Sequence, residues 1–91
     1  MEIPSDEGMM AELATYIQEE LSFDPDIAIE PDDEIIASGL MDSFSLVELR
    51  GWIEKRYGVF LPDHRVTAES FHTVRKMVPI IQEHLSAAAA N

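Results

Sequence analysis

The chain has 91 residues, of which 18 are acidic and only six are Lys or Arg, so its formal net charge is −12 at pH 7. An acidic surface argues against nucleic-acid binding, which needs basic side chains to displace counterions from phosphates, and indicates partners with basic surfaces. The chain has no cysteine, which excludes disulfides, a cysteine-ligated zinc site and any thiol of its own. This length predicts one domain over residues 1–91, with residues 1–5 and 87–91 as flexible ends.

The first residues carry neither a basic segment nor a long apolar run. We therefore expect a cytoplasmic protein without membrane insertion. Ser5 is a suitable N-cap for a first helix, with Asp6 and Glu7 in its first turn. Apolar residues at helical spacing then predict an amphipathic helix that ends near Ser22, because Pro25 cannot continue it; they are Met10, Leu13, Ala14, Ile17 and Leu21.

A long connection follows over residues 24–41, and a loop of this length in a compact domain is usually functional. Its acidic residues suggest a calcium loop, but Ala28, Ile29 and Ile35 occupy the fifth, sixth and twelfth positions of that motif, where an oxygen ligand, glycine and glutamate are required. We therefore interpret it as a solvated acidic loop. Five apolar residues are expected to hold it against the core: Phe23, Ile27, Ile29, Ile35 and Leu40.

A second helix is predicted from about Ser43 to Tyr57, with Asp42 as its N-cap and Gly58 after its last turn. Ser43 then lies at the start of this helix. Free N–H groups and partial positive charge would stabilise a phosphate esterified to Ser43.

Helical spacing separates this segment into two faces. Its predicted core face consists of Leu46, Leu49, Ile53 and Tyr57, and its predicted outer face consists of Phe44, Val47, Glu48, Gly51 and Lys55. Exposed apolar side chains beside Ser43 indicate a docking surface. Gly51 would permit close approach of a partner or is a tolerated surface glycine, and Trp52 on the flank is expected to be partly packed.

The remaining chain predicts an extended segment at residues 59–61 packed on the core, and a short helical turn capped by Thr67. Thr73 is the expected cap of a last helix, in which we expect Pro79 to cause a kink or a break. Its predicted core residues are Val74, Met77, Ile81 and Leu85. The predicted fold is an all-α bundle of three main helices and one short helix, with a long loop between the first and second helices.

The segment from Gly39 to Phe44, followed by Leu46 to Leu49, resembles the 4′-phosphopantetheine attachment site of acyl carrier proteins. The order of helices from about Leu13 to Ile81 is also similar to that family. The resemblance implies that a phosphopantetheinyl transferase esterifies Ser43 beside the capping residue Asp42. It also implies a monomer that contacts its partner enzymes through Phe44, Val47, Glu48, Gly51 and Glu54.

The cargo is less closely specified by these motifs. Asp before the serine resembles acyl carriers more than most peptidyl carriers, and Arg50, Lys55 and Arg56 depart from the acidic helix of fatty-acid carriers. These features favour a discrete carrier in a specialised, polyketide-type pathway, served by a loading enzyme and a downstream synthase or transferase. An aminoacyl carrier, for example for D-alanine, and an unmodified interaction module of the same fold are the alternatives.

Catalysis by the chain itself is not expected. The three histidines, His64, His72 and His84, are not spaced as a zinc motif, and none is near Ser43 in the sequence to act as its base. We therefore predict a protein that is not an enzyme and has no metal site.

Overall fold

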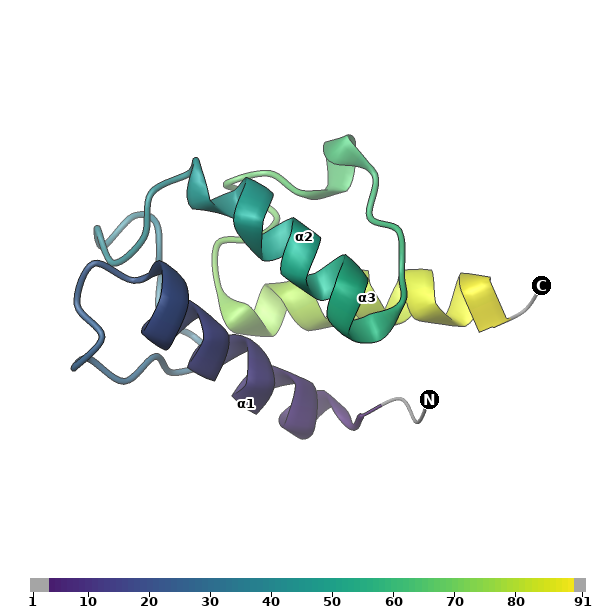
Figure 1. Cartoon of the computed structure of the whole chain (residues 1–91), viewed down its shortest axis with the longest axis horizontal. Helices are drawn as coiled ribbons and strands as arrows, with labels where there is room; N and C mark the ends of the chain where they lie inside the picture. Colours follow the sequence, from purple (N-terminus) through teal and green to yellow (C-terminus); the bar gives the residue numbers. More distant parts are fainter. Residues whose placement is uncertain (1–3, 90–91) are drawn as a thin grey trace.

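The computed structural model describes residues 4–89, which fold into helices joined by loops (Figure 1). The three α-helices are α1 (Asp6–Tyr16), α2 (Ser45–Tyr57) and α3 (Val74–Ala89). A π-helical turn, η1 (Ile17–Leu21), extends α1, and a 3₁₀ turn, η2 (Asp63–Arg65), follows α2. The predicted all-α bundle is confirmed. The expected flexible ends fall in part on residues 1–3 and 90–91, which lie outside the described residues.

The first helix begins where its capping residue predicts. The Ser5 hydroxyl oxygen accepts a hydrogen bond of 3.1 Å from the Gly8 N–H. Met9 is fully buried and Met10 only borders the core, so the expected core position of Met10 is wrong by one residue. Buried positions recur every four residues (Met9, Leu13, Ile17 and Leu21), and the wider π-helical turn keeps Leu21 on the buried face.

The long loop is held to the core by fewer apolar residues than expected. Ile29, Ile35 and Met41 are buried, whereas Phe23 and Ile27 are exposed, which corrects our expectation for those two. Leu40 is half-buried. Backbone hydrogen bonds do much of the anchoring, because Ile35 N–H donates to His72 O at 3.2 Å, Arg75 N–H to Pro31 O at 3.0 Å and Phe23 N–H to Leu40 O at 2.9 Å.

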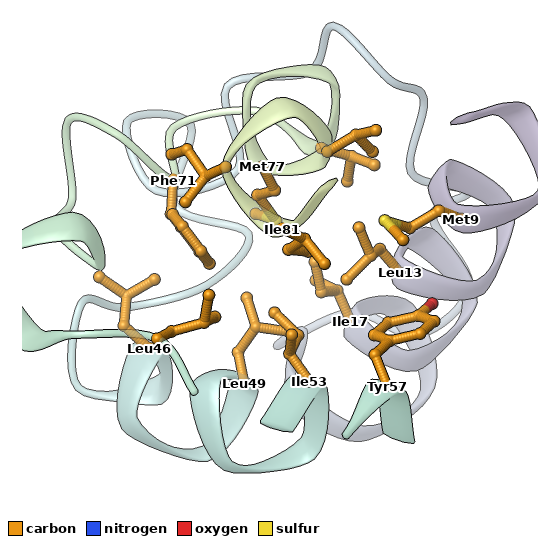
Figure 2. Packing of buried hydrophobic residues seen from close by; sticks show 14 of the residues in the cluster. Met9, Leu13, Ile17, Leu46, Leu49, Ile53, Tyr57, Phe71, Met77 and Ile81 are labelled. Carbon is orange, nitrogen blue, oxygen red and sulfur yellow. The ribbon is translucent and has the colours of Figure 1, made fainter. Parts of the chain in front are cut away.

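The core lies between the three helices (Figure 2). The predicted core faces of α2 and α3 are confirmed, because all eight residues assigned to them are buried. Phe71, just before α3, adds a fully buried ring to the same cluster. Thr73 caps α3, since its hydroxyl oxygen accepts a hydrogen bond of 3.1 Å from the Lys76 N–H.

Of the kink or break expected at Pro79, the break is absent, because α3 continues through this residue. Pro79 is exposed and lies in the second turn. Its missing N–H removes only the bond to the Arg75 carbonyl, near the start of the helix, where few intrahelical bonds precede it.

The segment between α2 and α3 begins at Gly58, whose φ of +65° closes the end of α2 in the left-handed region. Val59 and Leu61 are buried as expected, but Phe60 between them is exposed. The turn predicted at Thr67 is present as a single helical turn, in which the Phe71 N–H donates to Thr67 O at 2.9 Å. The short helix of the fold is instead η2, four residues earlier.

Aromatic stacking joins α1 to α2. The rings of Tyr16 and Trp52 lie 4.3 Å apart between centroids with an interplanar angle of 11°. Trp52 is half-buried, which confirms its expected partial packing.

Candidate functional site

The start of α2 differs from the prediction by two residues. Asp42 accepts hydrogen bonds through Oδ1 from the Ser45 N–H at 3.0 Å and the Ser45 hydroxyl at 3.2 Å. The N–H groups of Leu46 and Val47 donate to carbonyls three residues earlier, at 3.3 Å each, which is the pattern of a 3₁₀ turn. Regular α-helix therefore begins at Ser45, and Ser43 lies in the tight turn that precedes it.

The two serines of this turn differ in what their hydroxyl groups contact. The Ser45 hydroxyl is bound to Asp42, whereas the exposed Ser43 hydroxyl makes no hydrogen bond within residues 4–89. Modification of the Ser43 hydroxyl would thus break no hydrogen bond of the described chain. The first-turn N–H groups of Ser45, Leu46 and Val47 are already bound within the turn, so the expected free donors are absent there. The partial positive charge at the start of α2 still favours a phosphate at Ser43, and the site fits a phosphodiester.

An exposed apolar surface adjoins Ser43. Phe44 is 85% exposed and Val47 is 76% exposed. Glu48 and Gly51 are also exposed, and no atom lies within 4 Å of the position that a Cβ on Gly51 would occupy. Lys55, the fifth residue of the predicted outer face, is exposed as well. We keep the name outer face of α2 for the four residues closest in sequence to Ser43, namely Phe44, Val47, Glu48 and Gly51. It leaves room for another molecule to contact the helix.

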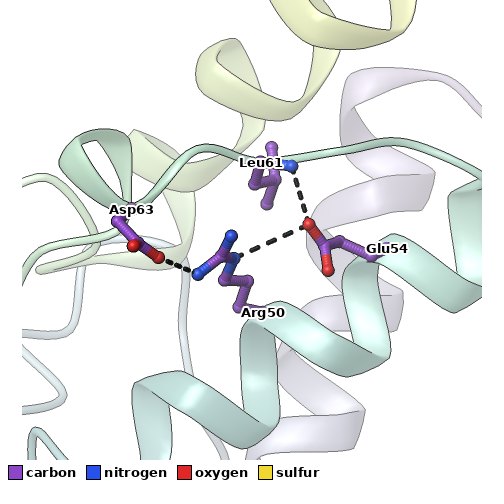
Figure 3. A network of polar contacts seen from close by, with 4 residues as sticks. All are labelled: Arg50, Glu54, Leu61 and Asp63. Atoms are coloured by element: carbon purple, nitrogen blue, oxygen red, sulfur yellow. Dashed lines mark hydrogen bonds and ion pairs between the residues drawn. The ribbon is translucent and has the colours of Figure 1, made fainter.

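Glu54 lies apart from the outer face. Its Oε2 accepts a hydrogen bond of 2.8 Å from the Leu61 N–H and so holds the segment that follows α2 against the helix (Figure 3).

A hollow of about 280 Å³ lies beside Ser43, between α2 and the segment that follows η2. Leu46, Val47 and Arg50 line it from α2, and Ser43 lines it from the preceding turn. Asp63 of η2 and residues 66–68 line the facing side. The hollow combines apolar walls with one cation and one carboxylate.

The cation of this hollow is held by carboxylates on two elements (Figure 3). The Arg50 guanidinium pairs with Asp63, and its Nε lies 3.6 Å from Glu54 Oε2. It also lies over the Phe60 ring, 5.7 Å from its centroid. The sequence shows Arg50 as a departure from the acidic helix of fatty-acid carriers. Its pairing with Asp63, 13 residues away, could not be predicted from any local sequence pattern.

No histidine of residues 4–89 is hydrogen-bonded to Ser43. His72 Nε2 lies 3.1 Å from Glu34 Oε1, and His84 Nδ1 lies 2.8 Å from the Ile80 carbonyl oxygen. Within residues 4–89 no group of three or more potential metal ligands occurs. The described helices also include none that is long and apolar enough to cross a membrane.

Shifted pKa values occur away from Ser43. The hydrogen bond from Arg75 lowers the pKa of Asp32, and burial, followed by the hydrogen bond to Glu12, raises the pKa of Tyr57. Both shifts arise at contacts that join structural elements.

Comparison with known proteins agrees with this geometry. Residues 11–79 match the family described as the phosphopantetheine attachment site. Over 53 residues the chain is 38% identical to a D-alanyl carrier protein of Bacillus velezensis, an overlap that covers 58% of this chain and 68% of that protein. The matches confirm 4′-phosphopantetheine as the cofactor and a carrier role without catalysis of its own. The chain belongs to the family of phosphopantetheine-binding carrier proteins.

Proposed function

We propose that Ser43 carries the 4′-phosphopantetheine group. The observation that supports this assignment is the exposed and unengaged hydroxyl of Ser43, next to Ser45, whose hydroxyl is bound to Asp42. The bound group supplies a terminal thiol, on which cargo is held as a thioester. The chain has no cysteine that could do the same.

The proposed roles of the chain's own residues follow from their positions. Asp42 orders the turn that presents Ser43. The outer face of α2 contacts the phosphopantetheinyl transferase and then the loading and downstream enzymes. The transferase must supply the base that activates Ser43, since no histidine of the described chain is hydrogen-bonded to it. We further propose that the protein works in the cytoplasm, as a monomer.

Glu54 has a different proposed role from the other four partner-binding candidates. Its carboxylate is already engaged by the Leu61 N–H, so a partner would contact it only at the edge of the docking surface.

For the cargo, our leading proposal is an acyl group of a specialised, polyketide-type pathway. The support is Asp42 before the serine and the basic residues Arg50, Lys55 and Arg56 on α2. Arg50 and Arg56 are paired with carboxylates of this chain, so the exposed Lys55 is the cation that would favour partners other than the enzymes that serve acidic fatty-acid carriers.

A D-alanyl or other aminoacyl cargo is the second candidate. It is favoured by the 38% identity to a D-alanyl carrier protein. The two candidates are separated by loading the phosphopantetheine form either with D-alanine, ATP and a D-alanine-activating ligase, or with malonyl-CoA and a malonyl transferase. Mass spectrometry then shows which cargo is retained.

The attachment site is tested by intact-protein mass spectrometry after incubation with coenzyme A, Mg²⁺ and a broad-specificity transferase. We expect one added phosphopantetheine on the native chain and on Ser45→Ala, and none on Ser43→Ala. Gain of the group by Ser43→Ala would refute the assignment. No gain by any folded variant, including with transferases from several carrier pathways, would favour the unmodified interaction module.

A further inference from the structure

Arg50 is the most enclosed charge beside Ser43. Its side chain is 25% exposed, and its Nε is shielded from solvent and makes no hydrogen bond within residues 4–89. Glu54 Oε2 lies 3.6 Å from this nitrogen, which is too long for a hydrogen bond. The Arg50 guanidinium therefore still has an N–H donor that could form a hydrogen bond with a suitably placed acceptor.

The two carboxylates around Arg50 are not equally fixed. Glu54 accepts a hydrogen bond from the Leu61 N–H and is therefore committed to the backbone. Asp63 is 91% exposed, and an ion pair to such an exposed group is weak and readily exchanged. Arg50 is thus held in the wall of the hollow, while its counterion can be replaced.

The hollow is also accessible from the attachment point. Ser43 and Arg50 both lie in its lining, and the seven-position step between them corresponds to about two helical turns, roughly 10 Å. A group tethered at Ser43 is present at high effective concentration in this hollow.

We propose that Arg50 is a specificity-determining receptor for a carboxylate on the cargo, so that the carrier prefers an acyl group that ends in a second carboxylate. Arg50 binds that carboxylate in place of Asp63, through the paired N–H geometry that suits guanidinium and carboxylate. Leu46 and Val66 contact the methylene groups of the same acyl chain. This inference rests on the proposed attachment at Ser43.

The test compares three forms of the full chain, made with a broad-specificity transferase from coenzyme A, valeryl-CoA and glutaryl-CoA. Valeryl and glutaryl cargo have the same number of carbons, and only glutaryl ends in a carboxylate. NMR of the ¹⁵N-labelled protein follows the Arg50 Nε–H and the amides of residues 66–68. We expect the glutaryl form alone to shift the Arg50 Nε–H, and its thioester to hydrolyse about three- to tenfold more slowly than in Arg50→Gln.

Substitutions of Arg50 and of Asp63 should change the glutaryl form in opposite directions. Arg50→Gln abolishes the glutaryl-specific shifts and the protection, whereas Asp63→Asn removes the competing carboxylate and increases both. Damage to the fold would weaken both variants in the same direction. Arg75→Gln and Asp32→Asn, which disrupt an ion pair of the same chemistry outside the hollow, are the matched controls and should leave the glutaryl form unchanged.

Each contrary outcome has a separate meaning. Equal shifts in the glutaryl and valeryl forms would refute carboxylate recognition, and a full shift already present with the bare phosphopantetheine group would identify its phosphate as the ligand of Arg50. Absence of a mass gain at Ser43 would instead refute the proposed function.

Discussion

The Tyr57 hydroxyl donates a hydrogen bond of 2.6 Å to Glu12 Oε1 and thereby joins the end of α2 to α1. Glu12 also accepts from Arg56 at 3.1 Å. We expect Tyr57→Phe to lower the free energy of unfolding by about 1–2 kcal/mol, because a hydrogen bond to a charged group is lost. Urea denaturation measures this loss. Arg56→Gln is the comparison and should lower the free energy of unfolding by less than about 1 kcal/mol. If Arg56→Gln lowers it more than Tyr57→Phe does, the ion pair with Glu12 contributes more to stability than the Tyr57 hydrogen bond.

The same contact predicts a pH dependence. Burial and the neighbouring Glu12 carboxylate raise the pKa of Tyr57 above its ordinary value of 10.0. The unfolded chain then loses this proton at lower pH than the folded chain, so the contribution of Tyr57 is complete below pH 10 and declines as the pH rises beyond it. Unfolding free energies measured from pH 8 to 11 should fall less in Tyr57→Phe than in the native chain. Parallel curves would show that Tyr57 is not responsible.

Two glycines should respond to alanine in opposite directions. Gly58 has a φ of +65°, so Gly58→Ala should destabilise the protein by about 1–2 kcal/mol. Gly51 lies in a regular helix with open space around it, so Gly51→Ala should stabilise by up to about 1 kcal/mol. Thermal denaturation checks both. If Gly51→Ala also slows modification, close approach of a partner explains the glycine; an unchanged rate leaves it as a tolerated surface residue.

Removing the acceptor at the start of α2 should loosen the turn that presents Ser43. Asp42→Ala loses the hydrogen bonds to Ser45 and should lower stability by about 1 kcal/mol, which corresponds to about 4–8 °C in Tm. Asp42→Asn keeps an acceptor and should lose less. An unchanged Tm in Asp42→Ala would show that the cap contributes nothing to stability.

The outer face of α2 is tested by placing a charge in its centre. Because Phe44 is almost fully exposed, Phe44→Asp should leave the circular dichroism spectrum unchanged and the free energy of unfolding within about 0.5 kcal/mol. Modification by the transferase should slow roughly tenfold if Phe44 contacts it, and Val47→Asp should behave alike. Ile27→Asp makes the same charge change at an exposed apolar residue of the long loop and should retain the native rate. Loss of helical signal in Phe44→Asp would place this residue in the core.

Regular helices were predicted well because burial repeats along them. The period of Leu46, Leu49 and Ile53 assigned the buried face of α2 correctly. Phe23 and Ile27 lie in a loop without a period, so their hydrophobicity alone suggested burial that the structure does not show. At the site, the sequence motif indicated Ser43 as the attachment residue. The pairing of Arg50 with Asp63 could not be predicted, because it depends on the path of the chain after α2 and not on any local sequence pattern.

The stacking of Tyr16 on Trp52 has a practical consequence. Trp52 is the chain's single tryptophan, and its indole also meets the Tyr57 ring edge-on at a centroid distance of 6.0 Å. Its fluorescence emission therefore reports whether α1 and α2 are still in contact. Since Trp52 is not among the residues that line the hollow beside Ser43, the protein carries an intrinsic optical probe of bundle integrity that is separate from the position where cargo is proposed to bind.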